Sequence, residues 1–170
     1  VLSITVILEA IRFYTKQIKM IHFSTDEIYG ESLEDVVFDE KSNFNPTNPY
    51  SATKASTEMI INSYKISFKI PILIVRCNNV FGIKQHHEKV IPLFISKALK
   101  DEELTIHGSG EKTRDFIHTD HVNSAVLTLI EKGDFNQIYN IGIENPINIL
   151  KLAKYIIKSV GKGSVKYIED

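Results

Sequence analysis

A short apolar run that ends in small polar and acidic residues constrains the fold of this chain most. Residues 19–23 read Lys-Met-Ile-His-Phe, and residues 24–27 read Ser-Thr-Asp-Glu. A run of this length, with β-branched and aromatic members, is typical of a buried parallel strand. Ligands of open α/β sheets bind outside the carboxyl ends of the strands. We therefore expect Thr25, Asp26 and Glu27 to lie at a ligand site, where two adjacent carboxylates can serve as acid and base.

Segments with the periods of strands and helices alternate along the rest of the chain. Further strands are predicted at residues 70–75, 104–106, 114–117, 137–142 and 165–168. Helices are predicted at residues 1–17, 50–68, 90–100, 119–132 and 149–160. This alternation favours an α/β sheet.

Two segments without a clear period are expected to be loops. Residues 31–48 are polar and acidic, with a possible short irregular strand at residues 35–40. Residues 107–113 contain two glycines but lack the Gly-Lys-Ser/Thr ending of a phosphate-binding loop. We expect this second segment to be a hairpin loop that joins the strands at residues 104–106 and 114–117.

Tyr50 and Lys54 begin the predicted helix at residues 50–68. They are four residues apart and therefore share one face of the helix. An ammonium group beside a phenol favours the phenolate, which lets a tyrosine act as a base near neutral pH. Thr25 is expected to hydrogen-bond the same phenol. A Tyr-Lys pair alone is weak evidence, but together with the acidic pair it indicates removal of a proton from an alcohol while hydride leaves its carbon.

Composition excludes several classes of partner. The chain has 170 residues and a net charge of −1, so it has no basic footprint for nucleic acid. No apolar run approaches the length of a membrane span. The single cysteine, Cys77, excludes an intramolecular disulfide and suits a reducing compartment. We expect a cytoplasmic protein of one domain, or part of one, without nucleic-acid or membrane partners.

Several polar residues remain ambiguous from the bare sequence. Neighbouring histidines, His86 with His87 and His118 with His121, are more often solvated than metal-bound, so no metal site is expected. The asparagines at 78 and 79, which follow a predicted strand, suit a ligand contact and a turn equally well.

Seven motifs, in this order, resemble the nucleotide-sugar branch of the extended short-chain dehydrogenase/reductase family, and within it the NAD-dependent nucleotide-glucose 4,6-dehydratases. The motifs are residues 24–30, 46–55, 78–82, 88–92, 106–108, 113–116 and 139–142. The resemblance implies a Rossmann-like parallel sheet with a smaller substrate-binding lobe. It also implies NAD as the cofactor and dTDP-glucose or UDP-glucose as the substrate.

The resemblance implies a role for each catalytic candidate. Tyr50, with Lys54 and Thr25, would deprotonate the sugar 4-hydroxyl while hydride passes to NAD. Glu27 would remove the proton at C5, and Asp26 would protonate the departing 6-hydroxyl. Hydride return to C6 would then give a 4-keto-6-deoxy sugar.

The resemblance also implies two sets of binding residues. The cofactor-binding set is Ser24, Tyr50, Lys54 and Asn79. The substrate-binding set is Asn79, Glu88, Lys89, Arg114 and Asn140. Relatives commonly dimerise through two helices that form a four-helix bundle, so a homodimer is expected through the helices at residues 1–17 and 50–68.

The Gly-rich dinucleotide loop of the family lies on its first strand, which has no counterpart here. We therefore expect the chain to be a fragment that is inactive alone and lacks the N-terminal dinucleotide-binding strands. Residues 1–82 are expected to be the C-terminal part of the NAD-binding domain, with the catalytic residues. Residues 83–170 are expected to form mainly the substrate-binding lobe, with strands and helices that return to the sheet.

Three alternatives to the dehydratase remain open. Two share the fold, a nucleotide-sugar epimerase and a decarboxylase. The third is a non-catalytic module that binds a nucleotide sugar. The Asp26-Glu27 pair favours the dehydratase, because epimerisation needs no acid/base pair for an elimination.

Overall fold

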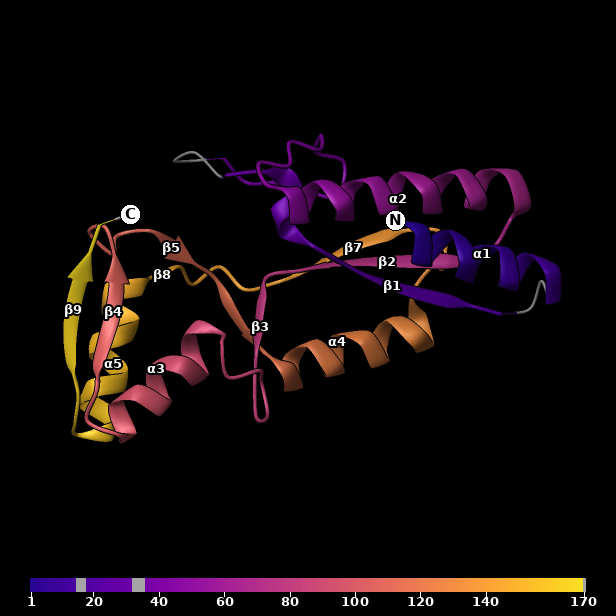
Figure 1. Cartoon of the computed structure of the whole chain (residues 1–170). Helices are drawn as coiled ribbons and strands as arrows, with labels where there is room; N and C mark the ends of the chain where they lie inside the picture. Colours follow the sequence, from indigo (N-terminus) through magenta and orange to yellow (C-terminus); the bar gives the residue numbers. More distant parts are fainter. Residues whose placement is uncertain (15–17, 32–35, 170) are drawn as a thin grey trace. The chain divides into compact units, whose positions relative to one another are not determined.

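The structure is a computed structural model that describes residues 1–14, 18–31 and 36–169 (Figure 1). The chain divides into two compact units. The first comprises Val1–Asn78 and Val122–Ile141, and the second comprises Asn79–His121 and Gly142–Asp170. Both units combine helices with parallel strand pairs, which confirms the predicted α/β class.

The first unit contains a parallel sheet in the strand order β1-β2-β7. Its strands are β1 (Met20–Thr25), β2 (Ile72–Cys77) and β7 (Ile138–Ile141). All six residues of the central strand β2 are buried, as expected for an apolar strand covered on both faces. The register pairs Thr25 with Cys77, so β1 and β2 end at the same edge of the sheet.

Helices cover both faces of this sheet (Figure 1). They are α1 (Leu2–Tyr14) and α2 (Pro49–Phe68) on one face and α4 (Thr119–Lys132) on the other. Ile72 and Ile74 of β2 join one apolar cluster with Leu8 of α1 and Ile61 of α2. Side chains of neighbouring strand residues point to opposite faces. Leu73 accordingly lies on the α4 side, beside Gly133.

Helix α2 begins and ends where its local sequence predicts. The Asn48 side chain accepts a hydrogen bond from the Ser51 backbone N–H, and the Ser51 hydroxyl oxygen accepts one from the Asn48 N–H. This reciprocal capping box, followed by Pro49, fixes the first turn. The helix ends at Phe68, and the next residue, Lys69, has a φ of 56° that turns the chain toward β2.

A buried ion pair joins the sheet to α2 and to the acidic loop. Arg76 Nη2 of β2 lies 2.7 Å from Glu58 Oε2 of α2, and both side chains are almost fully buried. Arg76 Nη1 donates to the Tyr29 hydroxyl at 2.7 Å and to the Glu40 carbonyl at 3.1 Å. The Tyr29 hydroxyl donates in turn to Asn140 of β7 at 2.8 Å. One guanidinium on β2 therefore bonds three other segments directly, and Tyr29 extends the network to β7.

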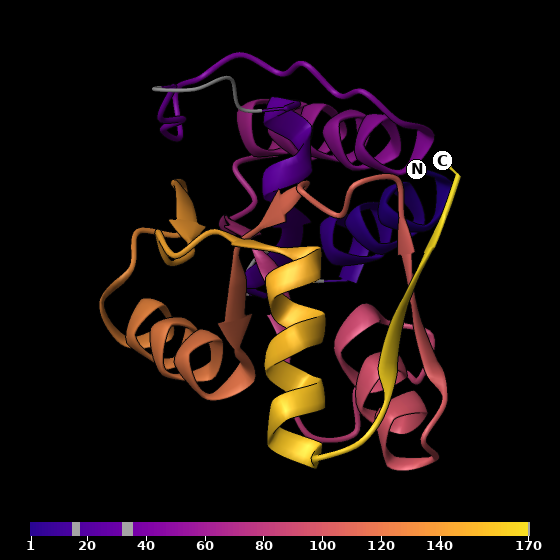
Figure 2. The ribbon, with the colours of Figure 1, turned by 90° about the vertical axis from the view of Figure 1, so that its left-hand side faces the viewer.

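The second unit is built from two-stranded pairs and two helices. Its strands are β3 (Asn79–Phe81), β4 (Glu103–His107), β5 (Thr113–Arg114), β6 (Phe116–His118), β8 (Ile147–Asn148) and β9 (Ser164–Ile168). Pairs β3-β6 and β4-β9 are parallel, and β5-β8 is antiparallel. Helices α3 (Val90–Leu99) and α5 (Ile149–Val160) pack beside β4 and β9 (Figure 2).

Two sequence predictions about pairing and extent differ from the structure. The predicted hairpin around residues 107–113 is wrong, because β4 pairs with β9 and β5 pairs with β8. The turn instead bonds to the start of α5, where the Leu150 N–H donates to the Gly110 carbonyl at 3.1 Å. Of the short strand predicted at residues 35–40, residues 36–40 contain no strand, and residue 35 lies outside the described residues. The last residues of the predicted first helix, 15–17, also lie outside them.

Within the described part of the chain, no helix combines the length and the apolar character that crossing a membrane requires.

The buried ion pair predicts a large loss of stability when one partner is removed. Glu58→Ala leaves the Arg76 charge buried without its counter-ion, so the free energy of unfolding should fall by about 3–5 kcal/mol. Urea denaturation of the full-length protein measures this change. Glu103→Ala is the matched control, because it removes an exposed pair with Lys166 and should cost about 0–1 kcal/mol. Equal losses in the two variants would contradict the role of the buried pair.

Candidate functional site

The acidic pair lies on a short turn at the carboxyl end of β1. The turn, η1 (Asp26–Tyr29), is a single 3₁₀ turn capped by Thr25. The Thr25 hydroxyl donates to Asp26 Oδ1 at 3.2 Å and accepts from the Glu27 N–H at 3.3 Å. Gly30 ends the turn with φ at +86°, and a Cβ there would lie 2.4 Å from the Asn45 carbonyl oxygen. A residue with a side chain would therefore displace the turn.

The Asp26 side chain is partly buried, and its main hydrogen-bond partner is the side-chain amide of Asn78. The Asn78 side chain, directly after β2, donates from Nδ2 to Asp26 Oδ2 at 3.0 Å. Burial raises the pKa of the Asp26 carboxyl, whereas the hydrogen bonds from Asn78 and Thr25 lower it and the Glu27 charge raises it. The net direction is upward, so Asp26 holds a proton at higher pH than an ordinary aspartate. This suits a proton donor.

Glu27 points toward the first turn of α2. Its Oε2 accepts a hydrogen bond from Asn48 Nδ2 at 3.0 Å, and its side chain is exposed. Asn48 caps the helix that carries Tyr50. The two carboxylates of the pair thus bond to different segments, Asp26 to the end of β2 and Glu27 to the start of α2.

The phenol of Tyr50 belongs to the same group of side chains. Burial raises the pKa of Tyr50, the Glu27 charge raises it further, and a hydrogen bond with the Thr25 side chain lowers it. Lys54 Nζ, in contrast, donates to the Phe23 carbonyl of β1 at 2.7 Å. The sequence predicts that Lys54 favours the phenolate of Tyr50. In this structure the Lys54 ammonium is hydrogen-bonded to the Phe23 carbonyl instead, and the pKa of the Tyr50 phenol lies above its ordinary value.

Ser24 and His22 precede this group on β1. The Ser24 hydroxyl oxygen and His22 Nε2 are buried and have no hydrogen-bond partner among the described residues. A buried hydroxyl without a partner is uncommon in folded proteins and marks a place where a ligand group can bond.

The predicted substrate-binding residues are divided between the two units. Asn140 lies on β7 of the first unit, where its side chain accepts from Tyr29 and its N–H donates to Glu40 Oε1 at 2.7 Å. Asn79, Glu88, Lys89 and Arg114 lie in the second unit. There Asn79 Nδ2 donates to the Asp115 carbonyl at 3.2 Å, Lys89 precedes α3, and Arg114 is exposed on β5.

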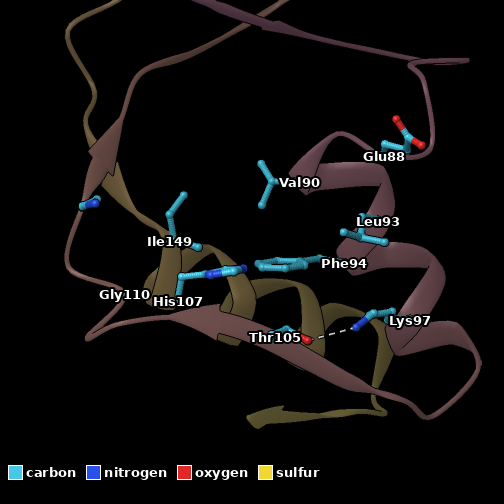
Figure 3. Close-up of a pocket in the computed structure, with 10 residues that line it drawn as sticks. Glu88, Val90, Leu93, Phe94, Lys97, Thr105, His107, Gly110 and Ile149 are labelled. Carbon is cyan, nitrogen blue, oxygen red and sulfur yellow. Dashed lines mark hydrogen bonds between the residues drawn. The ribbon is translucent and has the colours of Figure 1, made fainter. Parts of the chain in front are cut away.

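The second unit contains a cavity of about 480 Å³ between α3, β4 and the start of α5 (Figure 3). Its apolar lining is Val90, Leu93, Phe94 and Ile149, and its polar lining includes Glu88, Lys97, Thr105, His107 and Lys112. In Figure 3 the Phe94 ring and the His107 imidazole point toward one another. Lys97 Nζ donates to Thr105 Oγ1 at 3.1 Å. A lining that combines apolar side chains with a few charged ones suits a small organic ligand.

Within the residues that the structure describes, no group of three or more histidine, cysteine, aspartate or glutamate side chains is arranged to hold a metal ion. His86 Nδ1 lies 3.8 Å from Glu88 Oε2, and His118 Nδ1 lies 3.4 Å from Asp120 Oδ2. The side chains of both pairs are exposed or half-exposed.

Sequence reasoning missed three residues that shape the site. Asn48 was visible only as part of a loop before a proline, and Asn78 only as one of two ambiguous asparagines. Arg76 stood at the end of an apolar run, where a charged residue signals a buried partner. That signal was available, but the identity of the partner, Glu58, depends on which helix covers β2.

The sequence matches the family described as "NAD dependent epimerase/dehydratase family" over residues 1–142. It is 44% identical to a dTDP-D-glucose 4,6-dehydratase of Dictyostelium discoideum over 149 residues, which are 82% of this chain and 34% of the relative. It is 45% identical to the Bos taurus protein of the same name over 160 residues, which are 89% of this chain and 45% of the relative. The chain thus spans less than half the length of these curated relatives.

Solved structures of two kinds of enzyme match the whole fold. A dTDP-glucose 4,6-dehydratase of Bacillus anthracis in complex with NAD matches with a TM-score of 0.94 and 34% identity, over 100% of this chain and 55% of that one. A UDP-glucuronic acid 4-epimerase of Bacillus cereus in complex with UDP-glucuronic acid and NAD matches with a TM-score of 0.91 and 29% identity, over 99% and 54%. Both matches support the predicted fold class.

The environment of His22 predicts a pH dependence of stability. Burial, and then the Lys54 charge, lowers the pKa of His22 from 6.5 to about 4, against a weaker opposite effect of Glu58. Between these values the unfolded chain binds a proton that the native imidazole does not, so stability is complete above pH 6.5 and falls toward pH 4.

His22→Gln should therefore flatten the dependence of Tm on pH across this window in thermal melts of the full-length protein. His87→Gln, which changes an exposed imidazole, is the control and should keep the wild-type slope. If His22→Gln also keeps that slope, the assignment of the titration to His22 is wrong.

Proposed function

The chain belongs to the NAD dependent epimerase/dehydratase family, and from that premise we propose that its parent protein is a nucleotide-glucose 4,6-dehydratase acting on dTDP-glucose or UDP-glucose. The resemblance predicted from the sequence motifs is confirmed by the family match and by the curated relatives. The activity of the whole protein is a proposal, because the chain spans only part of those relatives.

The arrangement of Asp26 and Glu27 carries this proposal. Two adjacent carboxylates lie at the carboxyl end of a parallel strand, beside the phenol of Tyr50. Burial favours the protonated form of Asp26, and Glu27 is exposed beside a neutral amide donor. An elimination of water requires one group that removes a proton and one that supplies it to the leaving hydroxyl, and this pair offers both.

The residues present fit a nicotinamide dinucleotide as cofactor. The Ser24 hydroxyl is buried without a partner among the described residues, at the edge of the sheet where such ligands bind. The Lys54 ammonium has three donors, and its bond to the Phe23 carbonyl uses one of them. Ser24, Tyr50 and Lys54 of the first unit would hold the cofactor, and Asn79 of the second unit stays a cofactor contact predicted from the sequence. Bound NAD would supply hydride transfer, from C4 of the sugar in the oxidation and back to C6 in the reduction.

Each proton then has a residue of this chain to move it. Tyr50 takes the proton of the 4-hydroxyl as the 4-ketone forms. The Thr25 hydroxyl, and the Lys54 donors that the Phe23 carbonyl leaves free, would stabilise the phenolate against the effect of burial. Glu27 takes the C5 proton, which the ketone makes acidic. Asp26 gives its proton to the 6-hydroxyl, which leaves as water. Reprotonation at C5 and hydride return to C6 complete a 4-keto-6-deoxy sugar, so the reaction consumes no net oxidant.

The second unit supplies a place for the nucleotide part of the substrate. The cavity lined by Phe94 and His107 has the size of a small-molecule site. Its lining includes Glu88 and the cations Lys97 and Lys112. Within this unit we propose Lys89 and Arg114 as the cations for the diphosphate, with Asn79 and Glu88 as further substrate contacts. Asn140, which lies in the first unit, stays a substrate contact predicted from the sequence.

A nucleotide-sugar 4-epimerase is the second candidate, because a UDP-glucuronic acid 4-epimerase matches this fold nearly as well. Both reactions begin with oxidation at C4, for which Tyr50 and NAD suffice. They differ in the need for proton transfer at C5 and C6. The presence of both Asp26 and Glu27, each hydrogen-bonded to an asparagine amide, therefore favours the dehydratase.

The proposal predicts a selective defect in Glu27→Gln. Glutamine still accepts a hydrogen bond from Asn48 but cannot remove a proton, so exchange of the C5 proton with solvent should fall by about 100-fold or more. Oxidation at C4, followed as transient NADH absorbance in the full-length protein, should remain detectable. Glu131→Gln on the exposed face of α4 is the control and should exchange at the wild-type rate. Unchanged exchange in Glu27→Gln would overturn the role of Glu27.

We further propose that the protein is a homodimer through α1 and α2. Leu2, Val6 and Phe13 recur along one side of α1 and are each more than half exposed. Met59 and Ile66, seven residues apart on α2, are exposed to a similar extent. Two unpartnered apolar stripes on adjacent helices suit a four-helix bundle formed with a second copy.

Val6→Glu combined with Met59→Glu should convert a dimer of the full-length protein into a monomer, because the new carboxylates would be buried at the interface. Sedimentation velocity measures the change. Leu127→Glu, at an equally exposed leucine of α4, should leave the dimer intact. A wild-type monomer, or a double variant that remains dimeric, would contradict this interface.

We also propose a cytoplasmic location. Cys77 is a free thiol buried at the end of β2. Burial, and to a smaller extent the Asp26 charge, raises the pKa of this thiol to about 11, so it is protonated and unreactive at neutral pH. A chain with one unpaired cysteine suits a reducing compartment. Fractionation of the source cells tests this location.

A further inference from the structure

Asn48 makes two side-chain hydrogen bonds of opposite polarity. Its Oδ1 accepts from the Ser51 N–H at 2.9 Å, and its Nδ2 donates to Glu27 Oε2 at 3.0 Å. We propose that Asn48 is a positioning residue, which holds the Glu27 carboxylate at the N-terminus of α2 in the orientation that proton removal requires. This role rests on the function proposed above.

The orientation of the Asn48 amide follows from the capping box. Ser51 is fully buried, and its hydroxyl accepts from the Asn48 N–H at 3.3 Å and donates to the Asn48 carbonyl at 3.0 Å. The backbone of the cap is therefore fixed on both sides. Because the Ser51 N–H needs an acceptor, the oxygen of the amide must face the helix. The Nδ2 group is then the one that faces Glu27.

This arrangement couples the base to the helix that carries Tyr50. Tyr50 lies two residues after Asn48 on α2, while Glu27 lies on the turn after β1. The bond from Asn48 spans 21 residues of chain and fixes the distance between turn and helix. A neutral amide can do so at every pH, since it neither gains nor loses a proton.

The chemical surroundings of Glu27 make the polarity of this contact important. The Glu27 charge acts on two neighbouring titratable groups, Asp26 on its own turn and Tyr50 on α2. Neither supplies a positive charge. The Nδ2 group of Asn48 supplies a hydrogen-bond donor to a carboxylate oxygen of Glu27 without adding a charge to the site.

Two substitutions separate positioning from capping. Asn48→Ser keeps a good cap but loses the donor to Glu27. Exchange of the C5 proton should fall about tenfold, with C4 oxidation and the KM for the nucleotide sugar unchanged. Asn48→Asp also keeps the cap, but it places a carboxylate against Glu27. The acidic limb of the pH profile for C5 exchange should then move up by about one pH unit or more, because two close carboxylates share a proton.

Asn148 offers a matched control in the same chain. It caps α5 in the same way, with Oδ1 accepting from the Lys151 N–H at 2.7 Å. Asn148→Ser and Asn148→Asp should leave both the rate and the pH profile of C5 exchange at wild-type values. Thermal melts of all four full-length variants measure the contribution of each cap to folding.

The outcomes distinguish this role from the proposed function. If both Asn48 variants exchange C5 like the Asn148 variants, Asn48 is a helix cap only and the positioning role is overturned. If both Asn48 variants fail to fold while the Asn148 variants fold, the role is structural and the proposal is again overturned. If the wild-type protein itself exchanges no C5 proton, the dehydratase function fails, and the role of Asn48 fails with it.

Discussion

The parallel pairing of β1 with β2 is the constraint on which the site depends. The six paired positions run from Met20 with Ile72 to Thr25 with Cys77, so both strands end at one edge of the sheet. Asp26 and Asn78 follow these last positions directly, which is why an amide from a distant part of the sequence meets the first carboxylate. A register shift of one residue would turn every side chain of β1 to the opposite face. The acid, its partner and the hydroxyl of Thr25 are therefore set by one strand pairing.

At this edge of the sheet, a buried and an exposed polar contact hold the turn after β1 and its acidic residues in place. The buried guanidinium of Arg76 fixes Tyr29, and with it the far end of the turn that carries the acidic pair. Asn48 then holds Glu27 against the start of α2 through a more exposed bond. The contact of Arg76 is buried, and the contact of Asn48 with Glu27 is exposed. This arrangement suits the proposed role of Glu27 as a base, which needs access to substrate above a backbone that buried contacts hold.

Local sequence features predicted the elements well, because burial and capping act over a few residues. The apolar run at residues 19–23 predicted β1, and Asn148 and Gly161 predicted the ends of α5. The structure confirms both predictions. Pairing between distant strands was not predictable in this way. The glycines near residue 108 suggested a hairpin, but β4 pairs with a strand about 60 residues later, and no local signal encodes that choice. The direction of Lys54 depended likewise on which strand backbone lay beneath α2.

The most direct test of the account is the product that the full-length protein forms from dTDP-glucose or UDP-glucose with NAD in D₂O. In the proposed mechanism Glu27 exchanges its proton with solvent between removal and return. The account therefore predicts a 4-keto-6-deoxy sugar that carries deuterium at C5, which nuclear magnetic resonance identifies. A 4-epimer of the starting sugar without deuterium at C5 would contradict it, since oxidation at C4 would then occur without any use of the acidic pair.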